Sequence, residues 1–84
     1  MNQEIIARGQ NAKRVLDMPE FKATIEEVRK ELFDQFRKTN VADSEQREDL
    51  HKIMYACDLF VSRLQKYVEA GEFEVNSSQQ QEDA

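Results

Sequence analysis

Several residue types are scarce in this chain of 84 residues, which has no tryptophan, one cysteine, one proline and two glycines. The lone Cys57 cannot form an internal disulfide, so no disulfide framework is expected and a reducing compartment is predicted. Two isolated glycines cannot build a glycine-rich phosphate loop. There is no run of about 18 apolar residues, so neither a transmembrane helix nor a membrane partner is expected. The first residues lack the features of a signal peptide, which predicts a cytosolic protein.

The negative charge is concentrated at one end of the sequence. The net charge is −5, but residues 72–84 hold four acids and no base, whereas residues 1–71 hold 13 acids and 12 bases. The folded part is therefore expected to be nearly neutral, without the basic field that draws proteins to nucleic acid or anionic membranes. The first 16 residues are a local exception with a charge of +2.

The strongest pattern lies in residues 44–71, where apolar side chains recur at intervals of three and four residues. This spacing places them on one face of an α-helix. The main row is Leu50, Ile53, Cys57, Phe60, Leu64 and Tyr67, and a second row beside it is Met54, Val61 and Val68. The face is wider than the seam of a two-stranded coiled coil, so it requires more than one partner helix.

Two further helices are predicted before this one. Residues 2–16 are expected to form a short helix with Ile5 and Gly9 on one face, where the missing side chain of Gly9 lets another backbone come close. The sequence Asp17-Met18-Pro19-Glu20 predicts a break, with Asp17 as the cap of the next helix and proline in its first turn. That helix is expected to run to about residue 38 with a stripe of Phe21, Ile25, Val28, Leu32 and Phe36.

The predicted fold is all-α. It consists of an antiparallel hairpin of the two long helices with the shorter N-terminal helix packed on it, completed by oligomerisation. Residues 39–42 form the short connector that makes neighbouring helices antiparallel, and Asp43 or Ser44 caps the third helix.

The C-terminal boundary of this fold is placed at Gly71, which is expected to end the third helix. Residues 72–75 are expected to be extended, so the single helical domain covers residues 1–75. Residues 76–84 are rich in glutamine and acids and are expected to form a disordered tail.

Surplus apolar residues predict a protein-contact surface. Tyr55 and Leu59 are four residues apart and lie opposite the main apolar row. Ile5, Gly9 and Phe73 are expected to contribute to protein contacts as well. Because so short a chain buries only a small core, we expect a homo-oligomer.

Glu48-x-x-His51 is the constellation closest to a metal site. A Glu and a His three residues apart share a helix face, and di-iron carboxylate proteins use such pairs with glutamates from neighbouring helices. Glu27 and Glu31 would supply those glutamates, and a second copy the other pair. The simpler interpretation is a solvated first helical turn whose acids favour the helix dipole, so no metal site and no cofactor are predicted.

No residues predict catalysis. His51 has no nucleophile at a recognisable spacing, and Cys57 lies within the apolar row, where cysteine packs as a small hydrophobic residue. Arg8, Lys13 and Arg14 can contact phosphate groups, which makes a module for nucleic acid or a nucleotide an alternative. Three charges over two turns are more often simply solvated.

Short motifs are recognisable along the chain: Arg8-Gly9-x-x-Ala12, Leu16, Pro19-x-Phe21, Asp43-x-Glu45-x-Arg47-Glu48-x-Leu50 and Val68-x-x-Gly71. Together they resemble a widespread group of small helical proteins of tailed bacteriophages and prophages, often encoded near head and packaging genes. The likeness spans residues 8–71 and implies a phage source and a small helical hairpin. Members often carry tryptophan in their helices, which this chain lacks, and no catalytic residue is transferred.

The predicted function is that of a non-enzymatic phage protein that self-associates and binds another phage or host protein. It would be a virion component or an assembly or packaging accessory, in the host cytoplasm or in the virion. One alternative is a phage counter-defence module that sequesters a nucleotide signal or binds nucleic acid. The other is a di-iron carboxylate protein in an oligomer.

Overall fold

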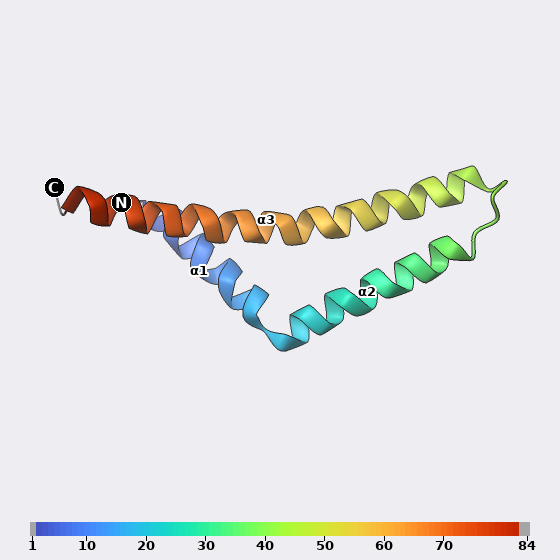
Figure 1. Cartoon of the computed structure of the whole chain (residues 1–84), viewed down its shortest axis with the longest axis horizontal. Helices are drawn as coiled ribbons and strands as arrows, with labels where there is room; N and C mark the ends of the chain where they lie inside the picture. The colour runs from blue at the N-terminus through green and yellow to red at the C-terminus, as the bar shows by residue number, and fades with distance from the viewer. Residues whose placement is uncertain (1, 83–84) are drawn as a thin grey trace.

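The computed structural model describes residues 2–82, with side chains to residue 79. It contains three helices, α1 (Gln3–Asp17), α2 (Pro19–Arg37) and α3 (Ser44–Glu82), and no strand in this part of the chain. The predicted all-α class is confirmed. Figure 1 shows α1 and α2 as two sides of a shallow triangle whose third side is α3.

The first two helices begin for different local reasons. Asn2 caps α1, because its side-chain oxygen accepts hydrogen bonds from the backbone N–H groups of Glu4 and Ile5 at 3.1 and 3.3 Å. Met18 separates the helices in an extended conformation (φ −72°, ψ 120°), as expected before a proline, and Pro19 opens α2. The predicted cap at Asp17 is wrong, since Asp17 still belongs to α1 and the N-cap position of α2 is Met18, which makes no side-chain cap bond.

The connection between α2 and α3 is held by local contacts. The hydroxyl of Thr39 donates a hydrogen bond to the carbonyl oxygen of Phe36 at 2.6 Å, and the Asn40 side chain accepts one from the N–H of Ala42 at 3.1 Å. The guanidinium of Arg47 lies over the ring of Phe36, 4.6 Å from its centre, so the end of α2 is tied to the start of α3.

Helix α3 is longer than the sequence predicts. It has 39 residues and runs through Gly71, so the predicted helix end there and the extended piece at residues 72–75 are both wrong. Gly71 does not adopt the positive φ of a helix-ending glycine. Residues 76–82, predicted as disordered tail, are the last part of α3 in the structure, and residues 83–84 lie outside the described residues.

The tightest packing in the molecule is the crossing of α1 with α3 at Gly9 and Gly71. A Cβ atom added to Gly9 would lie 2.7 Å from the carbonyl oxygen of Tyr67 and 3.1 Å from the Cα of Gly71. The close backbone approach predicted at Gly9 is therefore confirmed. Ile6 and Ala12 are buried on the same face of α1, and the backbone N–H of Asn2 donates a hydrogen bond to the Glu74 carboxylate at 2.7 Å.

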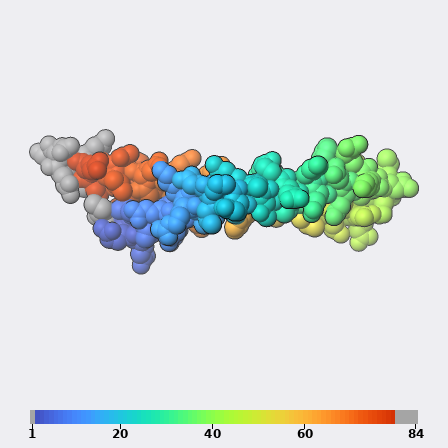
Figure 2. All heavy atoms as spheres, turned by 90° about the horizontal axis from the view of Figure 1, so that it is seen from below, coloured from blue at the N-terminus to red at the C-terminus, as the bar shows by residue number. Residues whose placement is uncertain are grey.

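Helices α2 and α3 run in opposite directions but pack loosely. Arg29 pairs with Asp58 and Phe36 with Arg47, so residue numbers rise along one helix as they fall along the other. No residue of α2 is buried, and among the side chains that the structure describes the buried apolar ones are only Ile6, Ala12 and Leu50. The molecule is elongated, with extents of 63 × 24 × 16 Å. In Figure 2, seen from below, α1 and α2 cover most of α3.

None of the described helices combines the length and the apolar composition that crossing a membrane requires.

Candidate protein-interaction surfaces

The first surface is the outer face of α3, which we define by Tyr55, Leu59 and Phe73. Their exposed fractions are 65%, 45% and 71%. At about 100° of rotation per residue, each of the three lies roughly 100° or more around the helix from Met54 and Gly71. Met54 lines a hollow shared with α2, and Gly71 contacts α1. The outer face therefore points away from both neighbouring helices, and Figure 1 shows no helix on that side of α3.

The second surface is an uncovered patch, which we define by Ile53 and Phe60 of α3. Their exposed fractions are 51% and 56%, so this part of the predicted apolar row has no covering helix within the chain. The reason is geometric: α1 ends at Asp17, beside Gln65, and so reaches only the C-terminal half of α3. Helix α2 lies beside a different part of the α3 surface, where its residues Arg29, Leu32 and Phe33 line a hollow with Met54 and Asp58 of α3.

A hollow of about 410 Å³ lies where the three helices meet, lined by residues that include Leu16, Phe21 and Val61. It is an open groove, and no side-chain polar atom in the described chain is both buried and without a partner. Apolar side chains such as Leu16 and Val61 line it together with charged ones such as Lys22 and Glu26, so the three helices do not close on one another here.

Two residues predicted for protein contact are used inside the molecule. Gly9 is buried against α3, and half-buried Ile5 presents its carbonyl oxygen 3.3 Å from a Cβ position at Gly71. Both therefore contact α3 of the same chain. The signal that identified them, small and apolar residues on one face of α1, is the signal of any helix crossing.

The basic residues predicted for phosphate contact do not converge. The guanidinium of Arg8 lies over the ring of Tyr67, 5.3 Å from its centre, and Lys13 lines a hollow with Gln10 and Glu72. Arg8, Lys13 and Arg14 are separated by about 100° or more around α1, so they point in three directions. A single phosphate group cannot be reached by all three.

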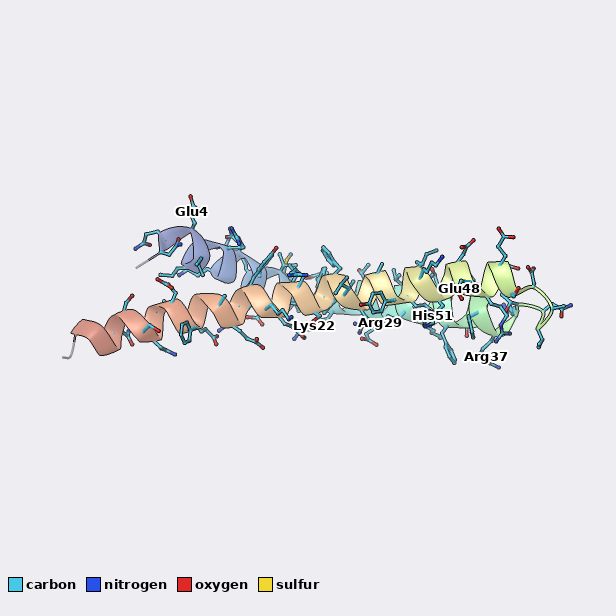
Figure 3. The ribbon with its side chains drawn as sticks, turned by 90° about the horizontal axis from the view of Figure 1, so that it is seen from above. Glu4, Lys22, Arg29, Arg37, Glu48 and His51 are labelled. Carbon is cyan, nitrogen blue, oxygen red and sulfur yellow. The ribbon has the colours of Figure 1, made fainter. Side chains whose placement is uncertain are left out.

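The residues considered for a metal site lie on open surface. His51 and Glu48 line a hollow with Phe36 and Arg47 at the α2–α3 turn, and Figure 3 shows them at this end of α3. Among the side chains described in residues 2–79, no group of three or more His, Cys, Asp or Glu is placed to hold a metal ion. Glu27 and Glu31 are exposed, and Cys57 is half-buried with a free thiol.

One charged cluster joins α2 to α3. Arg29 donates hydrogen bonds to Glu26 at 2.8 Å and to Asp58 at 3.0 Å. Partial desolvation lowers the pKa of Arg29, but the hydrogen bond to Glu26 and the charge of Asp58 outweigh it and raise the pKa overall. Both acids are more than 60% exposed, so the cluster orients α2 without adding much stability.

Sequence reasoning overlooked Val41, whose exposed fraction of 85% is the largest among the bulky apolar residues. Val41 lies in the connector beside Ser44 and Glu48. It is a single valine in a polar loop, and an analysis of apolar periodicity considers only residues that recur at regular intervals.

Comparison with protein-family models, with curated proteins and with solved structures finds no match to this chain.

Proposed function

We propose that this chain is a non-enzymatic phage protein that works by self-association and by binding another protein, as a virion component or an assembly or packaging accessory. Helices α2 and α3 act as an antiparallel hairpin that gains stability in an assembly. The outer face of α3 binds a second copy of the chain, and the uncovered patch of Ile53 and Phe60 binds a phage or host protein.

The observation that supports this proposal is the contrast between exposed and buried apolar side chains. Of the side chains described between residues 2 and 79, three apolar ones are buried, whereas nine large apolar ones are exposed, among them Tyr55, Phe60 and Phe73. Burying a large apolar side chain fully is worth about 1.5–3 kcal/mol, so half-exposed residues such as Ile53 each leave on the order of 1 kcal/mol to be gained in a complex. A small chain with so few buried residues has little stability without that gain.

The alternative functions lack such an observation. The basic residues of α1 diverge, which does not favour a nucleotide or nucleic-acid site. A di-iron site would depend on glutamates and a second histidine from another copy, which nothing in the described chain brings together.

Native mass spectrometry and sedimentation velocity test self-association. As the concentration rises from about 10 to about 300 μM, the purified protein is expected to form a growing fraction of dimers or larger species. A mass of one chain, 9.9 kDa, throughout this range would overturn the proposal.

The second part of the proposal is tested by co-purification from phage-infected cells. The wild-type protein is expected to carry another protein at fixed stoichiometry, and the double variant Ile53→Glu, Phe60→Glu to lose it. Lys30→Glu on α2 is the matched control, because it makes the same change of −2 in charge at an exposed position away from the patch. Equal recovery with the double variant would contradict a role of the patch.

A further inference from the structure

One line of positions follows the outer face of α3, and Val41 in the connector comes before it. Positions alternately four and three residues apart lie along one side of a helix, where a single partner helix can pack. They are Val41, Glu45, Glu48, Lys52, Tyr55, Leu59, Ser62, Lys66, Glu69 and Phe73, all exposed except the half-buried Ser62. We call these residues the outer seam.

A parallel pairing of two outer seams is strongly disfavoured. In a parallel in-register pair each residue faces its own copy, so Glu48 would face Glu48, Lys52 would face Lys52 and Lys66 would face Lys66. Like charges placed face to face destabilise an interface, and here they would occur in half of the layers of the seam. Only Tyr55, Leu59 and the two ends would gain.

An antiparallel pairing about a two-fold axis at the level of residue 57 gives the opposite result. Each residue then faces a residue of the partner such that the two residue numbers add up to 114. Tyr55 faces the partner's Leu59 and Glu48 faces the partner's Lys66, whereas Phe73 comes to the level of the partner's connector, in which Val41 is exposed. Because the contact is symmetric, each of these contacts occurs twice.

We infer that the outer seam is the site where a second copy of this chain docks, antiparallel, with Tyr55 and Leu59 at the two-fold axis. This rests on the proposed self-association and names its surface and geometry. The occupant is a second copy because the centre of the seam is complementary to itself: Tyr55 meets the partner's Leu59, and Glu48 meets the partner's Lys66.

The register is specified by the same residues. A shift of one heptad in one direction places Leu59 against the partner's Ser62 and Tyr55 against Lys66 of the partner subunit. A shift in the other direction places Leu59 against the partner's Glu48. Both shifts place an apolar side chain against a charged one, and removing that charge from water costs free energy. Only the proposed register pairs Tyr55 with the partner's Leu59.

One layer of the seam works against the dimer. Glu45 faces the partner's Glu69, so two carboxylates lie near each other at each end. With one kind of apolar pair, one kind of ion pair and this repulsion, the interface is of the small, weak class, and we expect a dissociation constant of about 1–100 μM.

The approach of a second copy to this side is unobstructed. Helices α1 and α2 both lie on the opposite side of α3, as Figures 1 and 2 show from two directions. No ion pair or hydrogen bond within the described chain occupies Glu48, Lys52 or Lys66, so these charges are available to a partner.

Charge reversal with measurement of the dimer dissociation constant tests the inference. Glu48→Lys alone and Lys66→Glu alone each put like charges in two layers and are expected to weaken the dimer at least about tenfold. The double variant is expected to return within about threefold of wild type. The matched controls are Glu27→Lys and Lys30→Glu, which make the same charge changes on the exposed side of α2 and are expected to leave the constant unchanged.

Glu69→Lys turns the repulsive layer into an attractive one and is expected to tighten the dimer several-fold, a gain that misfolding cannot imitate. If the wild type associates but neither single reversal weakens it, this inference is wrong and the proposed self-association stands. If the wild type is a monomer throughout, both are wrong.

Cross-linking in a Cys57→Ser background measures the direction. In the antiparallel dimer two copies of residue 59 are offset by about 6 Å along the axis and two copies of residue 73 by about 48 Å. A short bismaleimide is therefore expected to link Leu59→Cys and not Phe73→Cys. Efficient linking of Phe73→Cys, or of neither variant, would overturn the antiparallel seam.

Discussion

At the scale of single residues, Gly9 and Gly71 decide where α1 meets α3. Each leaves the space into which the other helix's backbone fits, with the Cα of Gly9 3.2 Å from a Cβ position at Gly71. A glycine in a helix interior costs about 1 kcal/mol relative to alanine, so this contact offsets an intrinsic penalty at two positions. The stability of the crossing therefore depends on the absence of a side chain at Gly9 and at Gly71.

Gly9→Ala is expected to lower the free energy of unfolding by about 1–2 kcal/mol. The added methyl group would meet the backbone of Tyr67 at 2.7 Å, and the cost of forcing the helices apart exceeds the gain in helix propensity. Urea unfolding followed by circular dichroism measures this. The control is Asn11→Ala on the exposed side of α1, which should stabilise by a few tenths of a kcal/mol. A more stable Gly9→Ala would show that the crossing is not formed.

Leu50 and Ile53 show that two residues of one apolar row can differ in burial. Both belong to one apolar row, yet Leu50 is 8% exposed and Ile53 is 51% exposed. Leu50→Ala is expected to cost about 2–3 kcal/mol of unfolding free energy and Ile53→Ala less than about 1 kcal/mol, because only the first leaves a cavity. Both are measured by urea unfolding at a concentration where the protein is monomeric. Equal losses would mean that the row is buried as a whole.

At the scale of helices, the three elements differ in how they are held. Helix α1 contributes Ile6, Gly9 and Ala12 as buried residues, whereas α2 contributes none. Helix α2 is attached by its turn, by the stacking of Arg47 on Phe36 and by the exposed pair of Arg29 with Asp58. Local opening is cheapest where few apolar contacts are broken, so α2 is the element expected to detach first.

Amide hydrogen exchange is expected to show this order. Amides in the middle of α2 should exchange at least about tenfold faster than those of residues 6–12 of α1, because opening α2 exposes little buried surface. Mass-resolved exchange of peptides covering each helix gives the comparison. Slower exchange in α2 than in α1 would show that α2 is packed more tightly than the structure has it.

At the scale of the whole molecule, shape distinguishes a dimer through the outer seam from other assemblies. The Cα radius of gyration is 18.3 Å, well above the value of about 12 Å for a compact domain of this length. The molecule is thus a rod, and its contacts with a second copy determine how long the rod becomes.

Small-angle X-ray scattering is expected to report a dimer about 18 Å longer than the single molecule. The proposed two-fold axis lies at residue 57, about six residues from the middle of α3, so the two rods overlap with an offset. A parallel in-register dimer would keep the length of 63 Å. Scattering from Glu48→Lys, measured at the same concentration, should return towards the monomer curve.

Some features of this protein follow from local sequence alone. The all-α class, the break at Met18-Pro19 and the start of α3 at Ser44 depend on the apolar spacing of three and four residues and on capping and proline rules, which act within one or two turns. The sequence also predicted that Tyr55 and Leu59 lie apart from the main apolar row, and both are exposed. These predictions succeed because the face on which a helical residue lies is set by its position in the chain.

Other features were decided only by how the helices meet. Gly71 has the composition of a helix end, but α3 continues through it because α1 needs that gap, a contact between residues 62 positions apart. Periodicity says which face is apolar but not how far a neighbouring helix reaches, so the exposure of Ile53 and Phe60 depends on where α1 stops. The burial of a side chain is a property of its neighbours, and those neighbours are set by tertiary packing.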